Sequence, residues 1–239
     1  MITKATTDFS ECDFSSGEVL LIDKPSGWSS FKVVRNVRKA AGVKKVGHAG
    51  TLDPMATGLL ILCTGKKTKE ISGFMNLKKT YTGVITLGKS TPSMDLETDI
   101  TEERSFEGIT EARINEIKEK FTGKILQVPP MYSAIKKDGK PLYKLARKGK
   151  VVEREPREIE IYSFIINRIE LPEIYFEITC SKGTYIRVIA NDFGNLLGSG
   201  GVLSALRRTG IGFYSVGDAL EVDDFVRRAT LKSPELFNL

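Results

Sequence analysis

The sequence predicts an α+β protein in which helices flank a mixed, mostly antiparallel sheet. Apolar runs of strand length occur among segments with the 3.6-residue period of helices. These segments do not follow the regular order of a chain of βαβ units, and no internal repeat is visible. The 239 residues are 41% hydrophobic, which is enough for one substantial core.

The N-terminal elements are predicted from apolar patterns and turn residues. Residues 1–17 are polar with little apolar pattern, so we expect a loose N-terminal segment. A strand is predicted at 19–22. A helix follows it, capped by Ser29 or Ser30 and ended by Gly42.

Further along the chain, the patterns predict five helices or strands before residue 181 and one helix after it. We expect a short helix at 68–75, a strand at 81–87, a loop at 89–109, a helix capped by Thr110 and closed by Gly123, a pair of strands at 157–168 and 173–180, and a helix capped by Thr184 and ended by Gly198. Short strands and a variable tail are expected to finish the chain.

Composition limits the classes of function. Lys and Arg number 36 against 30 Asp and Glu, a net charge of +6 that permits a nucleic-acid partner. Three scattered cysteines and the single His48 predict neither a disulfide framework nor a zinc site. No signal peptide and no apolar stretch near the ~20 residues of a membrane span are visible. We therefore expect a soluble, cytoplasmic protein.

The most informative segment is the loop at 47–58, Gly-His-Ala-Gly-Thr-Leu-Asp-Pro-Met-Ala-Thr-Gly. It holds one carboxylate, Asp53, and leads into the apolar run 59–63, which predicts a buried strand. Loops rich in glycine often need special backbone angles or close approach to a ligand. The alternative is a structural Asx-turn in which Asp53 bonds its own backbone.

Four motifs resemble, in order and spacing, those of the TruB-type tRNA pseudouridine synthases. Together they span roughly residues 20–213, so the resemblance covers most of the chain. They are Lys24-Pro25-Ser26-Gly27-Trp28-Ser29-Ser30, the loop at 47–58 with Leu59-Leu60, Ser181-Lys182-Gly183-Thr184-Tyr185-Ile186-Arg187, and Leu206-Arg207-Arg208-Thr209.

The resemblance implies three catalytic residues. Asp53 is the expected nucleophile, and Arg187 is expected to pair with it and keep it ionised. Tyr81, in Lys79-Thr80-Tyr81, is expected to stack on the target base and assist proton transfer. From the residues alone, Arg187 could equally be a solvated surface arginine and Tyr81 an ordinary strand residue.

The resemblance also implies residues that contact the substrate RNA. His48 is expected to enter the RNA where the target nucleotide leaves the stack, and Leu206 to pack against the flipped base. Each residue also has an ordinary structural alternative, His48 as a surface or hydrogen-bonded loop histidine and Leu206 as a residue of the core. Lys24 and Arg208 lie in matching motifs and are expected to bind the substrate.

A basic stretch at 131–150 is expected to be a flexible segment that contacts RNA. Lys136, Lys137 and Lys140 are its leading candidates, with tyrosines interleaved. The alternative is a solvated basic surface. In the loop after Tyr81, the family pattern Thr-Asp-Thr-x-Asp is matched by Thr91-Pro92-Ser93-Met94-Asp95, in which Pro92 replaces the first carboxylate.

The resemblance implies a curved sheet, a pseudouridine synthase catalytic domain at 18–214 and a short tail at 215–239. Many family members continue into a PUA-like RNA-binding domain, for which the 25 residues after Tyr214 are too few. The implied reaction converts uridine 55 in the T-stem-loop of tRNA to pseudouridine. We expect a monomer that uses no metal or cofactor.

Two other functions stay open at this point. One is a non-catalytic RNA-binding protein or tRNA chaperone on the same fold, although such a protein has no need of Asp53, Tyr81 and Arg187 together. The other is an enzyme that uses an aspartate nucleophile on a small molecule, such as a glycosidase. That class usually needs a second carboxylate, and no partner motif stands out.

Overall fold

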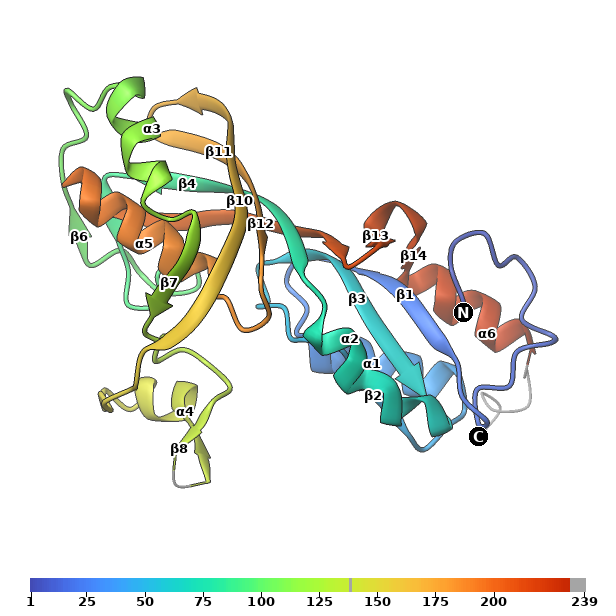
Figure 1. Ribbon diagram of the computed structural model, residues 1–239. Helices are drawn as coiled ribbons and strands as arrows, with labels where there is room; N and C mark the ends of the chain where they lie inside the picture. Colours follow the sequence, from blue (N-terminus) through green and yellow to red (C-terminus); the bar gives the residue numbers. More distant parts are fainter. Residues whose placement is uncertain (138, 233–239) are drawn as a thin grey trace. The chain divides into compact units, whose positions relative to one another are not determined.

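The computed structural model describes residues 1–137 and 139–232 and divides into two compact units. Met1–Tyr81 and Leu206–Leu239 form the first unit, and Thr82–Ala205 form the second. The chain passes between them within β4 (Lys79–Leu87) and again within β12 (Gly201–Ile211) (Figure 1). The range 18–214, expected as one catalytic domain, is thus shared between two units, because these two strands contribute residues to both.

The first unit is built on the antiparallel pair β1 (Val19–Lys24) and β3 (Thr57–Thr64), in which Leu20 lies opposite Leu62. Both strands are almost wholly buried, which explains their continuous apolar sequences. The strand order is β14-β1-β3-β12. The other strands of this unit are β2 (Val46–His48) antiparallel to β3, β14 (Leu220–Glu221) parallel to β1, the last part of β12 parallel to β3, and β13 (Tyr214–Ser215) antiparallel to β12.

Two layers of apolar side chains cover this pair of strands. Val33, Val37 and Ala40 of α1 (Ser30–Ala40) pack on one face with α6 (Val222–Lys232). The other face is covered by α2 (Ile71–Asn76), which follows the 3-10 helix η1 (Gly65–Glu70). The predicted helix after 19–22 is confirmed, with Ser29 rather than Ser30 as its cap, because the Ser29 side chain accepts a bond from the backbone of Lys32.

The prediction of a loose N-terminal segment is wrong. Ile2, Phe9 and Phe14 are buried and belong to the same core cluster as Phe225 of α6. The Ile2 amide donates to the Val19 carbonyl at 2.7 Å, so the segment also bonds to β1. A few apolar anchors in a polar stretch fix it, and they are too widely spaced to give a periodic signal. The expected tail likewise forms β14 and α6, and residues 233–239 lie outside the described part.

The second unit contains a long antiparallel hairpin, β10 (Arg157–Glu170) and β11 (Glu173–Cys180), as predicted around Leu171-Pro172. β7 (Gly123–Gln127), which the sequence did not predict, pairs with β10. The strand order is β12-β4-β11-β10-β7. Helices α3 (Glu111–Glu119) and α5 (Ile186–Leu197) lie against one face of these strands (Figure 1). Four rings from the strands, from α5 and from the turn after α3 cluster there: Phe121, Phe164, Phe176 and Phe193.

The caps of these two helices test the sequence patterns. Thr110 caps α3 as predicted, accepting from the Arg113 amide. Thr184 does not cap α5, because its hydroxyl donates to the Ser181 carbonyl instead, and the helix begins after Tyr185. Gly198 ends α5 in the left-handed conformation, at φ 86°, as its residue type favours.

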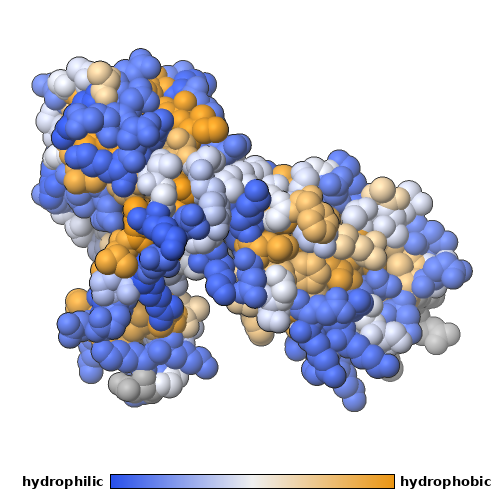
Figure 2. Space-filling view, in the orientation of Figure 1, coloured by the Kyte–Doolittle hydropathy of each residue, from blue (hydrophilic) through white to orange (hydrophobic). Residues whose placement is uncertain are grey.

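The remaining elements are short. They are β5 (Lys89–Ser90), β6 (Glu102–Glu103), β8 (Lys136–Lys137), β9 (Lys140–Pro141), α4 (Leu142–Ala146) and the 3-10 helix η2 (Val216–Asp218). The predicted α+β class with a mixed, mostly antiparallel sheet is confirmed. Among the described residues, no helix has the length and apolar character to cross a membrane. Figure 2 shows hydrophilic side chains over much of the face in view, with apolar areas between them.

The burial of Phe9 predicts a stabilising role for the N-terminal segment. Phe9→Ala should lower the free energy of unfolding by about 3 kcal/mol, because it removes a buried ring and leaves a cavity. Phe213→Ala is the control, since Phe213 is 83% exposed. Urea unfolding of both variants measures the difference, and equal stability would contradict the packing of the segment.

Candidate active site

The loop that carries Asp53 connects β2 to β3 and is held by close backbone contacts. Gly50 and Gly58 have φ angles of +105° and +102°, which favour glycine. A Cβ atom on Gly58 would lie 2.3 Å from the Arg208 carbonyl oxygen, so only glycine allows β12 to approach β3 here. Glycine therefore serves the close packing of two backbones directly beside the loop.

Both neighbours of Asp53 are anchored to the chain at residues 27–30, where it enters α1. The Leu52 amide donates to the Ser30 hydroxyl at 2.9 Å, and that hydroxyl lies 3.1 Å from the Leu52 carbonyl. On the other side, the Pro54 carbonyl accepts the Gly27 amide at 2.8 Å. The backbone is thus fixed immediately before and after Asp53, which is itself partly exposed. The sequence did not predict this role for Ser30.

Lys24 is a second anchor of the same loop. Its side chain is fully buried, and its ammonium donates to the carbonyls of Pro25, Trp28 and Pro54 at 2.9, 2.5 and 3.2 Å. Burial lowers the pKa of Lys24 from 10.5 to about 8, while the Asp53 carboxylate raises it and Arg208 lowers it further. The binding of substrate by Lys24 stays a prediction, and in the structure its ammonium is enclosed by these carbonyls.

Arg208 is also buried and bonds to the backbone around the loop. Its Nε donates to the Leu59 carbonyl at 2.7 Å and its Nη2 to the Gly50 carbonyl at 3.1 Å. These bonds join β12 to both ends of the Asp53 loop. The predicted contact of Arg208 with substrate likewise stays a prediction, since the structure shows the guanidinium bonded to the backbone. Its neighbour Arg207, which the sequence did not single out, forms a two-point ion pair with Asp23 at 2.6 and 3.1 Å.

His48 ends β2 opposite Leu62. Its Nδ1 is buried and has no hydrogen-bond partner among the described residues. Burial lowers the pKa of His48, and Arg208 lowers it further, so the ring is neutral at pH 7. The structure therefore presents an uncharged planar ring five residues before Asp53.

Tyr81 and Leu206 lie at the two crossings between the units. Tyr81, on β4, is 8% exposed, and Leu206, on β12, is half-buried. Both residues belong to the first unit, as do Asp53 and His48.

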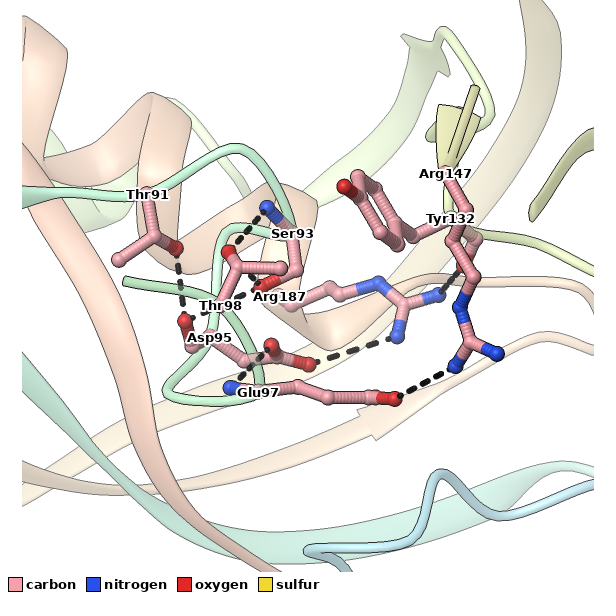
Figure 3. A network of polar contacts seen from close by, with 8 residues as sticks. All are labelled: Thr91, Ser93, Asp95, Glu97, Thr98, Tyr132, Arg147 and Arg187. Atoms are coloured by element: carbon pink, nitrogen blue, oxygen red, sulfur yellow. Dashed lines mark hydrogen bonds and ion pairs between the residues drawn. The ribbon is translucent and has the colours of Figure 1, made fainter. Parts of the chain in front are cut away.

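Arg187 lies in the first turn of α5 in the second unit. It is 3% exposed, so the alternative of a solvated surface arginine is wrong. Its Nη1 lies 3.5 Å from the Asp95 Oδ2, and its Nη2 donates to the Tyr132 carbonyl at 2.5 Å. Figure 3 shows these two partners on opposite sides of the guanidinium. The pairing of Arg187 with Asp53 stays a prediction, since the two residues belong to different units.

The loop that carries Asp95 is built to hold that carboxylate. Its Oδ1 accepts the Glu97 amide at 3.0 Å, and its own carbonyl accepts the Thr91 and Ser93 hydroxyls at 2.7 and 3.2 Å (Figure 3). Asp95 is buried, as an orienting partner of Arg187 must be. The sequence noted Asp95 as the retained carboxylate of this loop but gave it no partner.

Gln127 fixes the start of α5 from the end of β7. Its Oε1 accepts the Tyr185 amide at 2.8 Å, and its Nε2 donates to the Tyr185 carbonyl at 3.1 Å. No side chain caps α5, so this two-way pairing serves in place of a cap two residues before Arg187. The amide side chain offers both a donor and an acceptor, so this one residue bonds both backbone groups of Tyr185. The sequence patterns gave no signal for this residue.

Lys136, Lys137 and Lys140 are exposed on β8 and β9, as a nucleic-acid contact requires. The surrounding segment is attached to the rest of the unit at several points. Leu142 is buried, and the Tyr132 carbonyl accepts the bond from Arg187. Among residues 1–137 and 139–232, no group of three or more histidine, cysteine or acidic side chains could hold a metal ion.

Residues 38–186 match the model of the TruB family pseudouridylate synthase, N-terminal domain. A protein of Flavobacterium johnsoniae named tRNA pseudouridine synthase B is 50% identical over 220 residues, which cover 89% of this chain and 96% of that protein. One of the same name from Chloroherpeton thalassium is 51% identical over 91% of this chain and 92% of its own length. The chain belongs to the TruB family. It is therefore a pseudouridylate synthase.

A solved structure gives the same fold. The match in a Cbf5-Nop10-Gar1 complex has a TM-score of 0.69 and 26% identity, and covers 92% of this chain and 61% of that one. The segment that matches the TruB family model contains His48, Asp53 and Tyr81 and ends one residue before Arg187. The resemblance noted from the four motifs is thus confirmed at the level of the family.

The buried Lys24 of this TruB family member predicts a dependence of stability on pH. The folded protein releases the Lys24 proton near pH 8, whereas the unfolded chain keeps it to about 10.5. Because the unfolded state binds more protons between these values, the contribution of Lys24 to the unfolding free energy should rise with pH, by on the order of 2 kcal/mol.

Lys24→Met removes this titration, so the unfolding free energy of the wild type minus that of the variant should grow between pH 7.5 and pH 10. Urea unfolding at several pH values measures this difference. A difference that stays constant across the range would show that the ammonium is not destabilised by its surroundings.

Proposed function

We propose that this chain converts uridine to pseudouridine in tRNA, at position 55 of the T-stem-loop, with Asp53 as the nucleophile. The observation that carries the proposal is the support of Asp53. Its backbone neighbours are held by Ser30, Gly27 and Lys24, while the residue itself stays partly exposed. A carboxylate placed so firmly on a turn is suited to attack a bound substrate.

The reaction is an isomerisation that balances without a cofactor. The bond from ribose C1′ to N1 of uracil breaks, and a bond from C1′ to C5 forms. C5 loses a proton and N1 gains one, so no electrons are gained or lost overall. Asp53 would form a covalent intermediate with the substrate, and its departure would restore the carboxylate. Attack on the ribose and attack on the base both satisfy this balance.

Three residues of the first unit would receive the target nucleotide. We propose that Tyr81 stacks on the uracil and passes a proton, and that Leu206 packs on the other side of the base. His48 would fill the gap that the flipped nucleotide leaves in the RNA. Its neutral ring suits this place, because a stacked position excludes water and disfavours charge.

Arg187 would face Asp53 and keep it ionised. This part of the proposal is supported by the way Asp95 and the Tyr132 carbonyl fix the guanidinium. An arginine held on two sides cannot turn to solvent, so its charge stays at one place. The Gln127 pairing adds to this by fixing the first turn of α5.

The relatives named tRNA pseudouridine synthase B favour tRNA as the substrate. A glycosidase mechanism is disfavoured, because Asp53 is the sole acidic residue between Asp23 and Glu70, and Asp23 is engaged by Arg207. We propose that the chain acts as a monomer in the cytoplasm and needs no metal. A purely RNA-binding role would leave the support of Asp53 without a purpose.

The test of catalysis is Asp53→Asn, which keeps the size of the side chain and removes the nucleophile. The variant should fold and bind an unmodified tRNA transcript, yet form no pseudouridine over a time in which the wild type converts all of it. Asp99→Asn, a change at an exposed aspartate of the second unit, is the matched control and should stay active. Substantial turnover by Asp53→Asn would refute the mechanism.

Lys136, Lys137 and Lys140 are proposed to bind phosphates of the RNA. Replacing all three with alanine should weaken tRNA binding. It should also flatten the plot of log affinity against log salt by about 0.7 to 0.9 per lost contact, because fewer counterions are released. The matched control replaces Arg113, Lys120 and Lys124, which removes the same charge elsewhere in the second unit. Equal slopes for the two triple variants would identify the segment as an ordinary solvated surface.

A further inference from the structure

The region between Asp23 and Asp53 contains no acidic residue. These 29 residues, 24–52, would hold about four if the 30 acidic residues of the chain were spread evenly over its 239 positions. The region instead carries only positive charge, and apart from Lys24 these side chains lie in α1 and the turn after it: Lys32, Arg35, Arg38, Lys39, Lys44 and Lys45.

Helix α1 presents part of this charge as a single line to solvent. Its buried side is formed by Val33, Val34, Val37 and Ala40. On the other side, Phe31, Arg35 and Arg38 are exposed at spacings of four and three residues, so they follow one another along the helix. We call these three residues the α1 stripe. Phe31 is 68% exposed, an unusual position for a large aromatic ring.

The charges of the α1 stripe are not neutralised within the described protein. In residues 1–137 and 139–232, neither Arg35 nor Arg38 forms an ion pair, and α1 offers no acidic side chain three or four residues away. Helices α3 and α6 differ. In α3, Arg113 bonds Glu116 at 2.6 Å, and in α6, Arg227 bonds Asp224 at 2.5 Å. These two arginines of α1 thus lack the local partner that their counterparts have.

The α1 stripe begins at the loop that carries Asp53. Ser30, next to Phe31, bonds both backbone groups of Leu52. From Phe31 the stripe extends seven residues along the helix axis, about 10 Å. Lys32 lies beside its start, with its ammonium 3.8 Å from the centre of the Trp28 ring. Aromatic and basic side chains therefore lie together where the helix meets the loop.

We propose that the α1 stripe is a contact surface for RNA, separate from the basic segment at 131–150. Arg35 and Arg38 bind phosphates of the backbone, and Phe31 stacks on a ribose or an unpaired base. The inference rests on the proposed function, because RNA that reaches Asp53 then continues along α1. The stripe would serve affinity and orientation, and the chemistry would remain with the loop.

An anionic membrane is the other partner that a basic helix can suit, and the packing of α1 disfavours it. Membrane-surface helices insert a broad apolar face between the lipids. The apolar face of α1 is buried against the core, which leaves Phe31 alone for insertion. RNA binds through its phosphates and through stacking and needs no apolar face, so it fits the α1 stripe better.

The experiment is carried out in the Asp53→Asn background, so that binding is measured without turnover. Arg35→Gln with Arg38→Gln removes two charges and keeps good helix formers. For a full-length tRNA transcript, the plot of log affinity against log salt should flatten by about 1.4 to 1.8, the sum for two phosphate contacts. Phe31→Ala should weaken binding and leave the slope unchanged, because stacking releases no counterions. The control is Arg104→Gln with Arg113→Gln, which removes two charges from the second unit.

Circular dichroism and thermal unfolding verify that each variant is folded. An unchanged slope in the α1 variant, or a change no larger than that of the control, would overturn the inference. So would a variant that loses binding to phosphatidylserine vesicles but not to tRNA. A wild type that binds tRNA without forming pseudouridine refutes the proposed function alone, since the slopes are still read from binding. A wild type that does not bind tRNA refutes both.

Discussion

Two buried cations that bond to backbone carbonyls hold the loop on which the site depends. Lys24 donates to three carbonyls, one of them in Pro54, and Arg208 donates to those of Gly50 and Leu59. A buried charge without partners would cost several kcal/mol, so these bonds must form when the protein folds. The loop consequently has one low-energy arrangement, and Asp53 is presented in it.

The second unit applies a related solution to Arg187. A carboxylate and a carbonyl, rather than carbonyls alone, fix its guanidinium, and the carboxylate is held in turn by the Asp95 loop. Pro92 stands where the family pattern has its first carboxylate, and the support of Asp95 does not need that carboxylate. The hydroxyls of Thr91 and Ser93 bond the Asp95 carbonyl instead. Each unit therefore orients one charged group through bonds made within that unit.

The sequence predicted what depends on local pattern. The strand at 59–63, the caps Ser29 and Thr110, and the hairpin around Leu171-Pro172 follow from periodicity and turn residues. The sequence patterns did not predict contacts that depend on the three-dimensional fold. Thr184 has the residue type of a cap, yet Ser181 takes its hydroxyl. Lys24 and Arg208 carry charges that normally face solvent or ligand, and only the fold reveals the carbonyls that enclose them.

The same reasoning explains why Gln127 and Ser30 escaped notice. Gln127 bonds the backbone of Tyr185 at the start of α5, 58 residues away in the sequence. Ser30 bonds the backbone of Leu52 in the Asp53 loop, 22 residues away. No spacing rule covers such pairs. The basic residues of α1 were equally visible in the sequence, but their meaning depends on which helix face is buried. Once the valines of α1 are seen to occupy the core, Arg35 and Arg38 are left without acidic neighbours, and an anionic partner becomes the natural complement.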